Sequence, residues 1–199
     1  MAGQTKGAQT RQAILAAAIA RFGREGYRST SVADIARDAA VSGTLAYAYF
    51  PSKEALFLAA VDEDAAGVIR EGLTSVMADP TVEDWRRTLI FTLVGAVEHH
   101  PLARRLLAGL EPEVTERVLE IPALADLRKA CAQRLRGEQL AGSVRPDIDP
   151  VTIANGLVAI ILSLLMSVVQ VGSNAANTYA DDVAAVFKAA LDRTPPPHG

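Results

Sequence analysis

The chain has 199 residues, of which half are apolar, and a formal net charge of −3 at pH 7. This length and composition favour one or two small folded domains and exclude a largely disordered chain. The negative charge argues against a nonspecific nucleic-acid binder. The single cysteine, Cys131, excludes an intrachain disulfide; packing is its expected role, and a redox or covalent sensor is the alternative.

Charge is distributed unevenly along the sequence. Through Ala60 there are seven Lys and Arg residues against four Asp and Glu residues, a net of +3, so the remainder carries −6. A basic N-terminal head on an acidic body fits a protein that binds DNA with one end only.

The N-terminal residues predict a polar arm followed by a long helix. Met1–Gln9 lacks the apolar segment of a signal peptide, which predicts a cytoplasmic protein. Thr10 is expected to cap the helix, in which apolar residues recur every four positions from Ile14 to Phe22. Gly26 is expected to end this helix.

The next stretch predicts two short helices joined by a tight turn. Ser31 can cap the first helix, and the turn falls near Ala40 and Val41. Ser42 can cap the second helix, which is expected to run from Gly43 to Phe50. Proline at position 51 stops that helix, and the serine at 52 caps a third one. This arrangement is a helix-turn-helix, whose second helix fits a DNA major groove.

Several side chains of this stretch suit contacts with DNA. Hydroxyl groups and a lysine lie at predicted helix starts, where free N–H groups favour an anion, and tyrosines can reach phosphates and thymine methyls. A helical hairpin with ordinary caps is the alternative interpretation. The candidate DNA-binding residues are Thr30, Ser42, Gly43, Thr44, Tyr47, Tyr49 and Lys53.

The segment from Thr10 to about Val61 resembles the DNA-binding domain of tetracycline-repressor (TetR) type transcriptional regulators. The resemblance rests on FGREGY, on TSVADIA and above all on VS followed by YAYFPSKEALF. It implies phosphate contacts by Thr30, Ser42, Tyr49 and Lys53. It also implies that Gly43, Thr44 and Tyr47 face base edges.

This chain departs from the family's pattern at three positions of the second helix. The family often has a basic residue at the position of Gly43, a glycine at that of Thr44 and a large apolar residue at that of Ala46. Because Gly43 replaces that basic residue, the chain lacks an obvious side chain for recognising guanine. The operator sequence therefore does not follow from the resemblance.

The remaining sequence predicts six further helices. The expected ranges are 52 to 76 or 77, 81 or 82 to about 98, 102–110, 122–140, 151–171 and about 176–191. Val151–Val171 is long enough to span a bilayer, but polar residues interrupt it and acidic residues flank it. We therefore expect a buried helix, covered partly by a second subunit, and a four-helix interface between two copies.

No enzyme motif is evident. The sequence lacks a glycine-rich phosphate loop, a nucleophile elbow and a pair of metal ligands at helical spacing. His99 and His100 are adjacent, so they point about 100° apart on a helix and cannot chelate one metal as an i, i+4 pair would. We expect no enzymatic activity, no cofactor and no metal site.

The sequence as a whole predicts an all-α protein with two domains. Residues 10–56 form a three-helix DNA-binding domain, and residues 57–193 form a helical domain for effector binding and dimerisation. The resemblance implies a repressor that a small-molecule effector releases from DNA. The excess apolar surface predicts a homodimer, whose two symmetric heads require a palindromic double-stranded DNA operator, and we expect no membrane insertion. The guessed pocket residues are Trp85, Leu89, Phe91, Val94, Leu162 and Met166. An all-α protein-interaction module without DNA binding is the main alternative.

Overall fold

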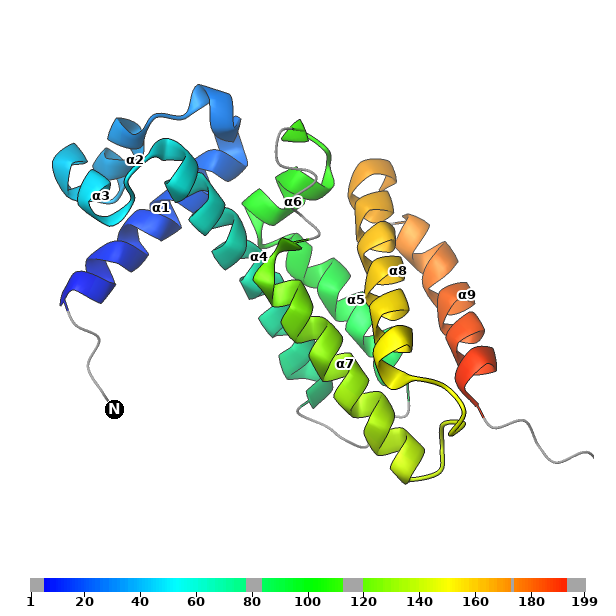
Figure 1. Cartoon of the computed structure of the whole chain (residues 1–199). Helices are drawn as coiled ribbons and strands as arrows, with labels where there is room; N and C mark the ends of the chain where they lie inside the picture. Colours follow the sequence, from blue (N-terminus) through cyan, green and yellow to red (C-terminus); the bar gives the residue numbers. More distant parts are fainter. Residues whose placement is uncertain (1–5, 78–83, 113–119, 173, 193–199) are drawn as a thin grey trace, which may run out of the picture. The chain divides into compact units, whose positions relative to one another are not determined.

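The computed structural model describes residues 6–77, 84–112, 120–172 and 174–192. Within these ranges the chain is all-helical apart from short turns and one isolated antiparallel bridge between Val144 and Asp192 (Figure 1). The helices are α1 Lys6–Ser29, α2 Val32–Asp38, α3 Gly43–Tyr49, α4 Lys53–Met77, α5 Trp85–Val97, α6 Pro101–Leu107, α7 Pro122–Leu140, α8 Pro150–Val171 and α9 Asn174–Leu191.

The start of α1 differs from the prediction. Thr10 does not cap the helix, because its hydroxyl donates to the carbonyl of Lys6 at 3.0 Å, one turn back inside the same helix. The first helix therefore begins at Lys6, and part of the predicted polar arm is helical. The helix was expected to end at Gly26; it continues to Ser29, but Gly26 interrupts the helical backbone there with a φ of 84°.

The helix-turn-helix has the predicted caps. The Ser31 hydroxyl accepts a hydrogen bond from the Asp34 N–H, and the Ser42 hydroxyl accepts one from the Leu45 N–H, each at 3.1 Å. The turn also lies where the sequence placed it. Ala40 adopts the left-handed conformation with a φ of 54°. Serine oxygens at these positions satisfy N–H groups that the first turn of a helix leaves unpaired.

Helix α6 is shorter than predicted, and a side chain of another helix caps its N-terminus. It ends at Leu107 rather than Leu110, because Gly109 turns the chain with a φ of 71°. At its start, Asp64 of α4 accepts hydrogen bonds from the N–H groups of Leu102 at 2.9 Å and Ala103 at 2.8 Å. The other oxygen of Asp64 lies 2.7 Å from Nδ1 of His100.

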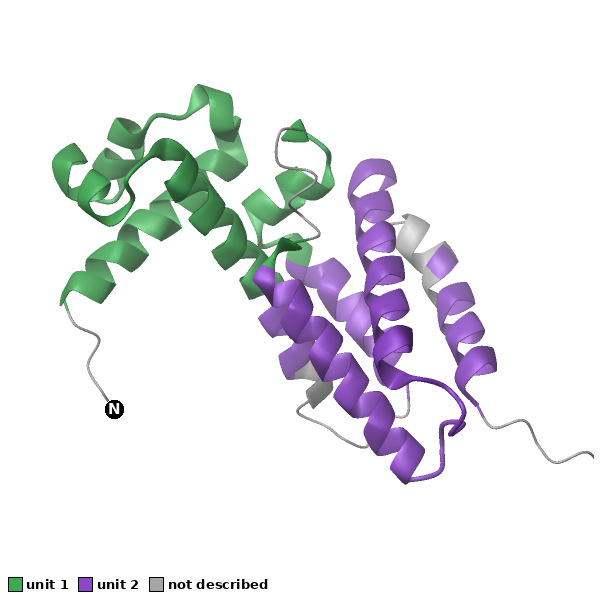
Figure 2. Ribbon diagram, in the orientation of Figure 1, with its two compact units in different colours: residues 1–68, 97–121 green, residues 69–96, 122–199 purple. Residues whose placement is uncertain are grey.

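The described helices form two compact units, which are considered separately (Figure 2). Unit 1 comprises residues 1–68 and 97–121, so it contains α1, α2, α3, the first part of α4, and α6. In it α1 packs against α2 and α6, and α2 packs against α3. The aromatic core joins Phe22 to Phe57 and Tyr27 to Phe57, with ring centroids 4.9 Å apart in each pair.

Unit 2 comprises residues 69–96 and 122–199, with α5, α7, α8, α9 and the end of α4. Helix α8 packs against both α7 and α9. By length and composition α8 is the one described helix that could cross a membrane. One side of it is buried inside the unit, through residues such as Leu157 and Ile161, whereas Val151, Ile160 and Val171 are exposed. The expected cover from a second subunit stays a prediction.

Candidate nucleic-acid interface

Helix α3 presents an outward face on a fixed base. Ala46 is fully buried and the capping residue Phe50 is nearly so, which anchors the helix in unit 1. On the outer side Thr44 is exposed, Tyr47 is 52% exposed and Leu45 is 39% exposed. Gly43, at the start of the helix, faces open space, since a Cβ added there would meet no atom within 4 Å. The prediction missed Leu45, although this leucine directly follows Thr44, which the sequence did single out.

Three of the four predicted phosphate-contacting residues surround α3. Ser42 is exposed at its start, and Tyr49 and Lys53 are half-buried at or just beyond its end. A Cβ at Gly7 of α1 would lie 3.3 Å from the Tyr49 hydroxyl, so the extra turn of α1 passes close to this tyrosine. These side chains share one region of unit 1, as an interface with a DNA backbone requires.

Thr30 has a different environment. It is 3% exposed, and its hydroxyl donates to the carbonyl of Gly26 at 2.8 Å. This hydrogen bond satisfies a carbonyl that the break in α1 would otherwise leave unpaired. A phosphate contact through this hydroxyl would require it to exchange that partner, and the contact stays a prediction.

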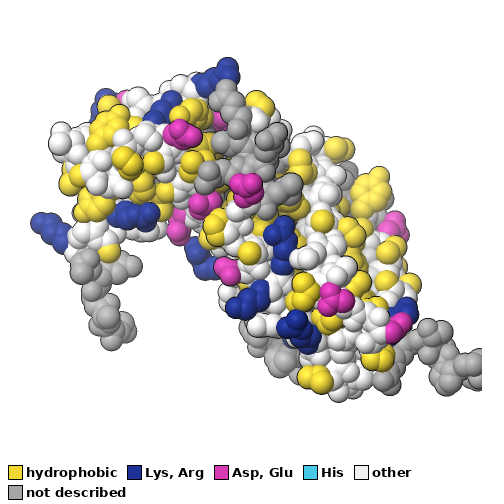
Figure 3. Space-filling model, in the orientation of Figure 1, with side chains coloured by type: hydrophobic (Ala, Val, Ile, Leu, Met, Phe, Trp, Pro, Cys, Tyr) yellow, Lys and Arg dark blue, Asp and Glu magenta, His cyan; other side chains and the backbone are white. Residues whose placement is uncertain are grey.

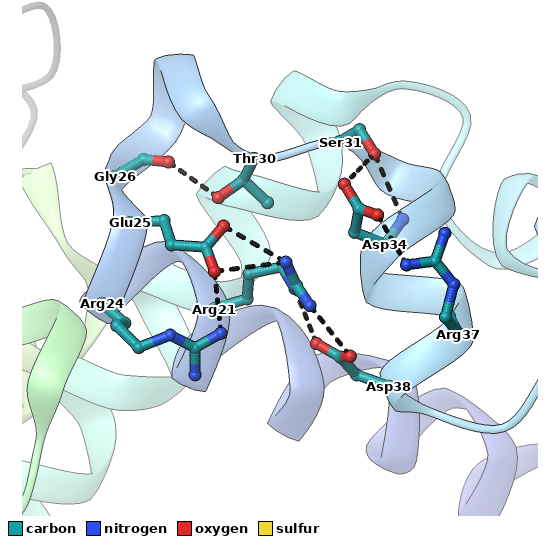
Figure 4. A network of polar contacts seen from close by, with 9 residues as sticks. All are labelled: Arg21, Arg24, Glu25, Gly26, Thr30, Ser31, Asp34, Arg37 and Asp38. Atoms are coloured by element: carbon teal, nitrogen blue, oxygen red, sulfur yellow. Dashed lines mark hydrogen bonds and ion pairs between the residues drawn. The ribbon is translucent and has the colours of Figure 1, made fainter.

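A network of ion pairs ties α1 to α2 (Figure 4). Arg21 donates from Nε to Asp38 at 2.6 Å and from Nη2 to the other Asp38 oxygen at 3.0 Å. This two-point pairing lowers the pKa of Asp38 and raises the pKa of Arg21. A bidentate Arg–carboxylate pair fixes orientation as well as distance, so the network sets how the helix-turn-helix sits on α1.

Two further arginines of the head are paired in the same network. Arg24 lies 2.8 Å from Glu25, and its hydrogen bond is the main cause of the lowered pKa of that carboxyl. Arg37 lies 3.0 Å from Asp34. The pKa of Asp34 is lowered mainly by the Ser31 hydroxyl and then by the charge of Arg37. Three of the seven cations counted in the head are therefore engaged with carboxylates of the head itself.

Two other cations of the head lie on aromatic rings beside α3. The Arg11 guanidinium is 5.0 Å from the centroid of the Phe50 ring, and Lys53 Nζ is 4.4 Å from that of the Tyr27 ring. An aromatic face attracts a cation without cancelling its charge. Arg11 and Lys53 therefore offer positive charge near the end of α3, where phosphates of a DNA bound by α3 would pass.

The residues guessed to line an effector pocket all lie in unit 2. Trp85 and Leu89 are fully buried, and Trp85 Nε1–H donates to Glu138 of α7 at 2.8 Å. The other four are half-buried: Phe91, Val94, Leu162 and Met166. A hollow of about 330 Å³ opens elsewhere, between α7 and α8, with Arg128, Lys129, Arg136 and Asn155 in its lining. The guessed pocket stays a prediction.

Cys131 is a packing residue. It is 2% exposed, and burial raises the pKa of its thiol to about 12 against an opposing effect of Arg86. A thiol with that pKa stays protonated and unreactive near neutral pH. In the part of the chain that the structure describes, no group of three or more His, Cys, Asp or Glu side chains is arranged to hold a metal ion.

The fold and the exposed α3 define a class, the helix-turn-helix regulatory proteins. Comparison with known proteins narrows it, because the profile of the family described as "Bacterial regulatory proteins, tetR family" matches residues 14–60. The A-factor receptor protein of Streptomyces griseus is 32% identical over 160 residues, which cover 80% of this chain and 55% of that protein. This chain thus spans about half the length of that relative.

Two further comparisons cover a larger share of the related protein. The HTH-type transcriptional regulator UidR of Escherichia coli (strain K12) is 29% identical over 159 residues, or 73% of this chain and 74% of UidR. A TetR-family transcriptional regulator from Mesorhizobium loti MAFF303099 shares the fold, with a TM-score of 0.72 and 24% identity over 96% of this chain and 100% of that one.

By these comparisons residues 14–60 form a DNA-binding domain of the TetR family, and the rest of the chain is similar to TetR-type regulators in sequence and fold. Members of this family are DNA-binding regulators of transcription rather than enzymes; they bind operator DNA, dimerise and bind small-molecule ligands.

Proposed function

We propose that this chain is a homodimeric repressor that binds a palindromic operator through α3 of each copy and leaves it when a small molecule binds. The observation that carries the proposal is the outward face of α3, with Thr44, Leu45 and Tyr47 exposed and Arg11 and Lys53 beside its end. A polar and apolar face flanked by cations suits a major groove and its two phosphate backbones.

We assign different tasks to the residues of this interface. Side chains that carry hydroxyl or ammonium groups at helix ends hold phosphates: Thr30, Ser42, Tyr49 and Lys53. The start and middle of α3 face base edges: Gly43, Thr44 and Tyr47. Because Gly43 has open space around its α-carbon, its contribution is the close approach of backbone to base edges. With few direct base contacts, part of the specificity comes from DNA shape.

The second copy is proposed to cover α8 and α9. Apolar side chains reach the visible surface over both helices (Figure 3). Ile160 of α8 is 40% exposed, and Tyr179 and Val186 of α9 are 54% and 65% exposed. Exposed apolar surface of this kind on two neighbouring helices is typical of a protein–protein interface and supports the proposal. In a single copy part of the apolar surface of α8 is exposed, and the helices of a second copy would bury it.

The effector is proposed to act through linkage. A ligand that binds one conformation of the dimer better than another shifts the population away from the DNA-competent form. The half-buried apolar side chains of Phe91, Val94, Leu162 and Met166 would suit a lipophilic ligand. The relative named A-factor receptor protein supports a receptor role for this chain as well.

The proposed division of labour keeps the boundaries inferred from the sequence. Residues 10–56 bind DNA, and residues 57–193 bind the effector and the second copy. We also propose that the protein acts in the cytoplasm, as the soluble regulators of this family do.

Selection of bound fragments from a genomic DNA library tests the proposal. We expect a palindromic sequence whose half-site centres lie about one DNA turn (~34 Å) apart or a multiple of it. The variant Tyr47→Ala, which keeps the fold but trims the exposed face of α3, serves as the control and should enrich this sequence weakly. Failure to enrich any sequence would contradict the proposal.

A further inference from the structure

Glu111 belongs to unit 1, where it contacts Tyr27, a residue 84 positions earlier in the sequence. It is 9% exposed, and its Oε1 accepts hydrogen bonds from the N–H of Tyr27 at 3.1 Å and from Nε of Arg105 at 2.6 Å. A carboxylate is costly to bury unless it is paired in this way. None of the DNA contacts assigned above uses this group.

The break in α1 explains why an acceptor is needed at this point. Gly26 has a φ of 84° and a ψ of 169°, so the N–H that follows it has no regular helical geometry. A Cβ on Gly26 would lie 2.7 Å from Oε1 of Glu111 and 2.4 Å from Nη2 of Arg105. Glycine therefore supplies both the unusual conformation and the room for the ion pair, and Glu111 caps the interrupted backbone.

The segment directly after the break contacts Lys53, the first residue of α4. Lys53 Nζ lies 4.4 Å from the centroid of the Tyr27 ring and donates to the carbonyl of Arg28 at 3.5 Å. The Tyr27 ring is itself held against Phe57, at 4.9 Å between centroids. Both groups that hold the ammonium therefore belong to residues directly after the break, and one of them is the residue that Glu111 caps.

We propose that Glu111 is a positioning residue for DNA binding: it fixes the backbone at Tyr27 and, through the Tyr27 ring and the Arg28 carbonyl, aims Lys53 at a phosphate. The proposal rests on the proposed function, in which Lys53 contacts the DNA backbone. A lysine that is already oriented loses less conformational freedom when it binds. Removal of Glu111 should thus weaken DNA binding through Lys53, even though it removes a negative charge.

A double-mutant cycle tests the coupling, with a mixed-sequence DNA duplex as the probe. Lys53→Ala should weaken binding about tenfold and lower the salt slope by about one unit. Glu111→Ala should weaken binding about threefold or more and lower the salt slope as well. The double variant should bind no more weakly than Lys53→Ala, because the two residues act through one contact.

Glu98→Ala is the matched control. It removes the same charge from unit 1 at an exposed position, where Glu98 pairs with Arg104 at 3.5 Å, and should leave the affinity and the salt slope intact or raise the affinity slightly. Glu111→Gln keeps an acceptor for the Tyr27 N–H and should restore most of the affinity. If Glu111→Ala does not fold, Tyr27→Leu, which removes the aromatic face, takes its place. It should weaken DNA binding in the unmodified background but not in the Lys53→Ala background.

The possible results separate the two proposals. Losses from Glu111→Ala and Lys53→Ala that simply add would overturn the positioning role, because a residue that only stabilises the fold acts independently of Lys53. An undiminished affinity of Lys53→Ala would overturn both the phosphate role of Lys53 and the role of Glu111. Absence of DNA binding by the unmodified chain would instead contradict the proposed function itself.

Discussion

The two units of this protein differ in the surface that each presents, although both use side-chain caps: Asp149 caps α8 of unit 2 as Ser31 caps α2 of unit 1. In unit 1 the ends and breaks of helices are fixed by directional hydrogen bonds, which backbone N–H groups donate to the Ser31 and Ser42 hydroxyls and to the Asp64 and Glu111 carboxylates. In unit 2 the long helix α8 packs through an apolar side and leaves apolar residues such as Ile160 exposed. Hydrogen bonds fix geometry, whereas apolar burial is non-directional. This difference is the one that we expect of a head that holds one surface in place and of a body that accepts a second copy.

The largest effect should come from placing a charge on the exposed side of α8. Ile160→Glu should convert the dimer into a monomer or an insoluble chain, because desolvating an unpaired carboxylate in an interface costs several kcal/mol, about 3 or more. Sedimentation measures this directly. Leu45→Glu is the control, since Leu45 of unit 1 is 39% exposed against 40% for Ile160. It should remain dimeric while losing DNA binding, and a dimer that survives Ile160→Glu would place the interface elsewhere.

The next effect concerns the surface of α3. Thr44→Ala should lose about 1–3 kcal/mol of binding free energy on the selected operator and less on random DNA, as expected for a base contact. Tyr47→Ala should behave similarly, with a narrower gap because its hydroxyl can also reach phosphate. Binding titrations on both DNAs provide the measurement. Equal losses of Thr44→Ala on the two DNAs would make Thr44 a structural residue and move the reading face elsewhere.

A smaller effect tests the strain in the turn of the head. Ala40 has a φ of 54°, a conformation that costs a residue with a Cβ about 1 kcal/mol relative to glycine. Ala40→Gly should therefore raise the free energy of unfolding by about 0.5–1 kcal/mol in urea denaturation. Gly109→Ala is the opposite case. Gly109 has a φ of 71° and open space around it, so Gly109→Ala should lower the free energy of unfolding through backbone strain alone.

The smallest effect is the pH dependence of the network between α1 and α2. The hydrogen bond from Arg21 lowers the pKa of Asp38 in the folded state. Between the folded and the unfolded pKa of Asp38, the folded protein therefore binds fewer protons than the unfolded chain. The stabilisation is complete above the ordinary pKa of an aspartate, about 3.9, and is lost as pH falls through the lower, folded pKa.

Denaturation midpoints measured across this acid range test the sign. The unmodified chain should lose stability more steeply on acidification than Asp38→Asn, in which the titrating group is absent. Asp126→Asn, at an exposed carboxylate of α7 in unit 2, is the control and should follow the unmodified chain. Identical slopes for the unmodified chain and Asp38→Asn would mean that this ion pair contributes nothing to the pH dependence.

Local signals made the head predictable. Each cap, at Ser31, Ser42 and Ser52, is a serine whose hydroxyl bonds to an N–H three residues later, so a short window of sequence contains the whole interaction. The break at Gly26 is local in the same sense. Thr10 misled the prediction because a threonine can also bond back to the preceding turn, and only the structure shows that it does.

Contacts between distant residues could not be read from the sequence. Unit 1 contains residues 97–121 because α6 packs on α1 and takes its cap from Asp64, 38 and 39 positions away from the two N–H groups. The tie between Glu111 and Tyr27 is of the same kind. The effector residues were the least predictable, because an apolar stripe has the same pattern whether it faces a core or a ligand.

The cap that Asp64 of α4 provides for α6 also bears on the order in which the protein folds. A helix of seven residues is too short to persist alone in water, and the first N–H groups of α6 find their acceptor only on α4. We therefore expect α6 to consolidate only when α4 is in place to supply this acceptor. Kinetic φ-values near zero are expected at Leu102 and Leu106, and higher values along α2, whose cap Ser31 is local. The Asp64 carboxylate, which joins α4 to α6, would then also determine the order in which these two helices form.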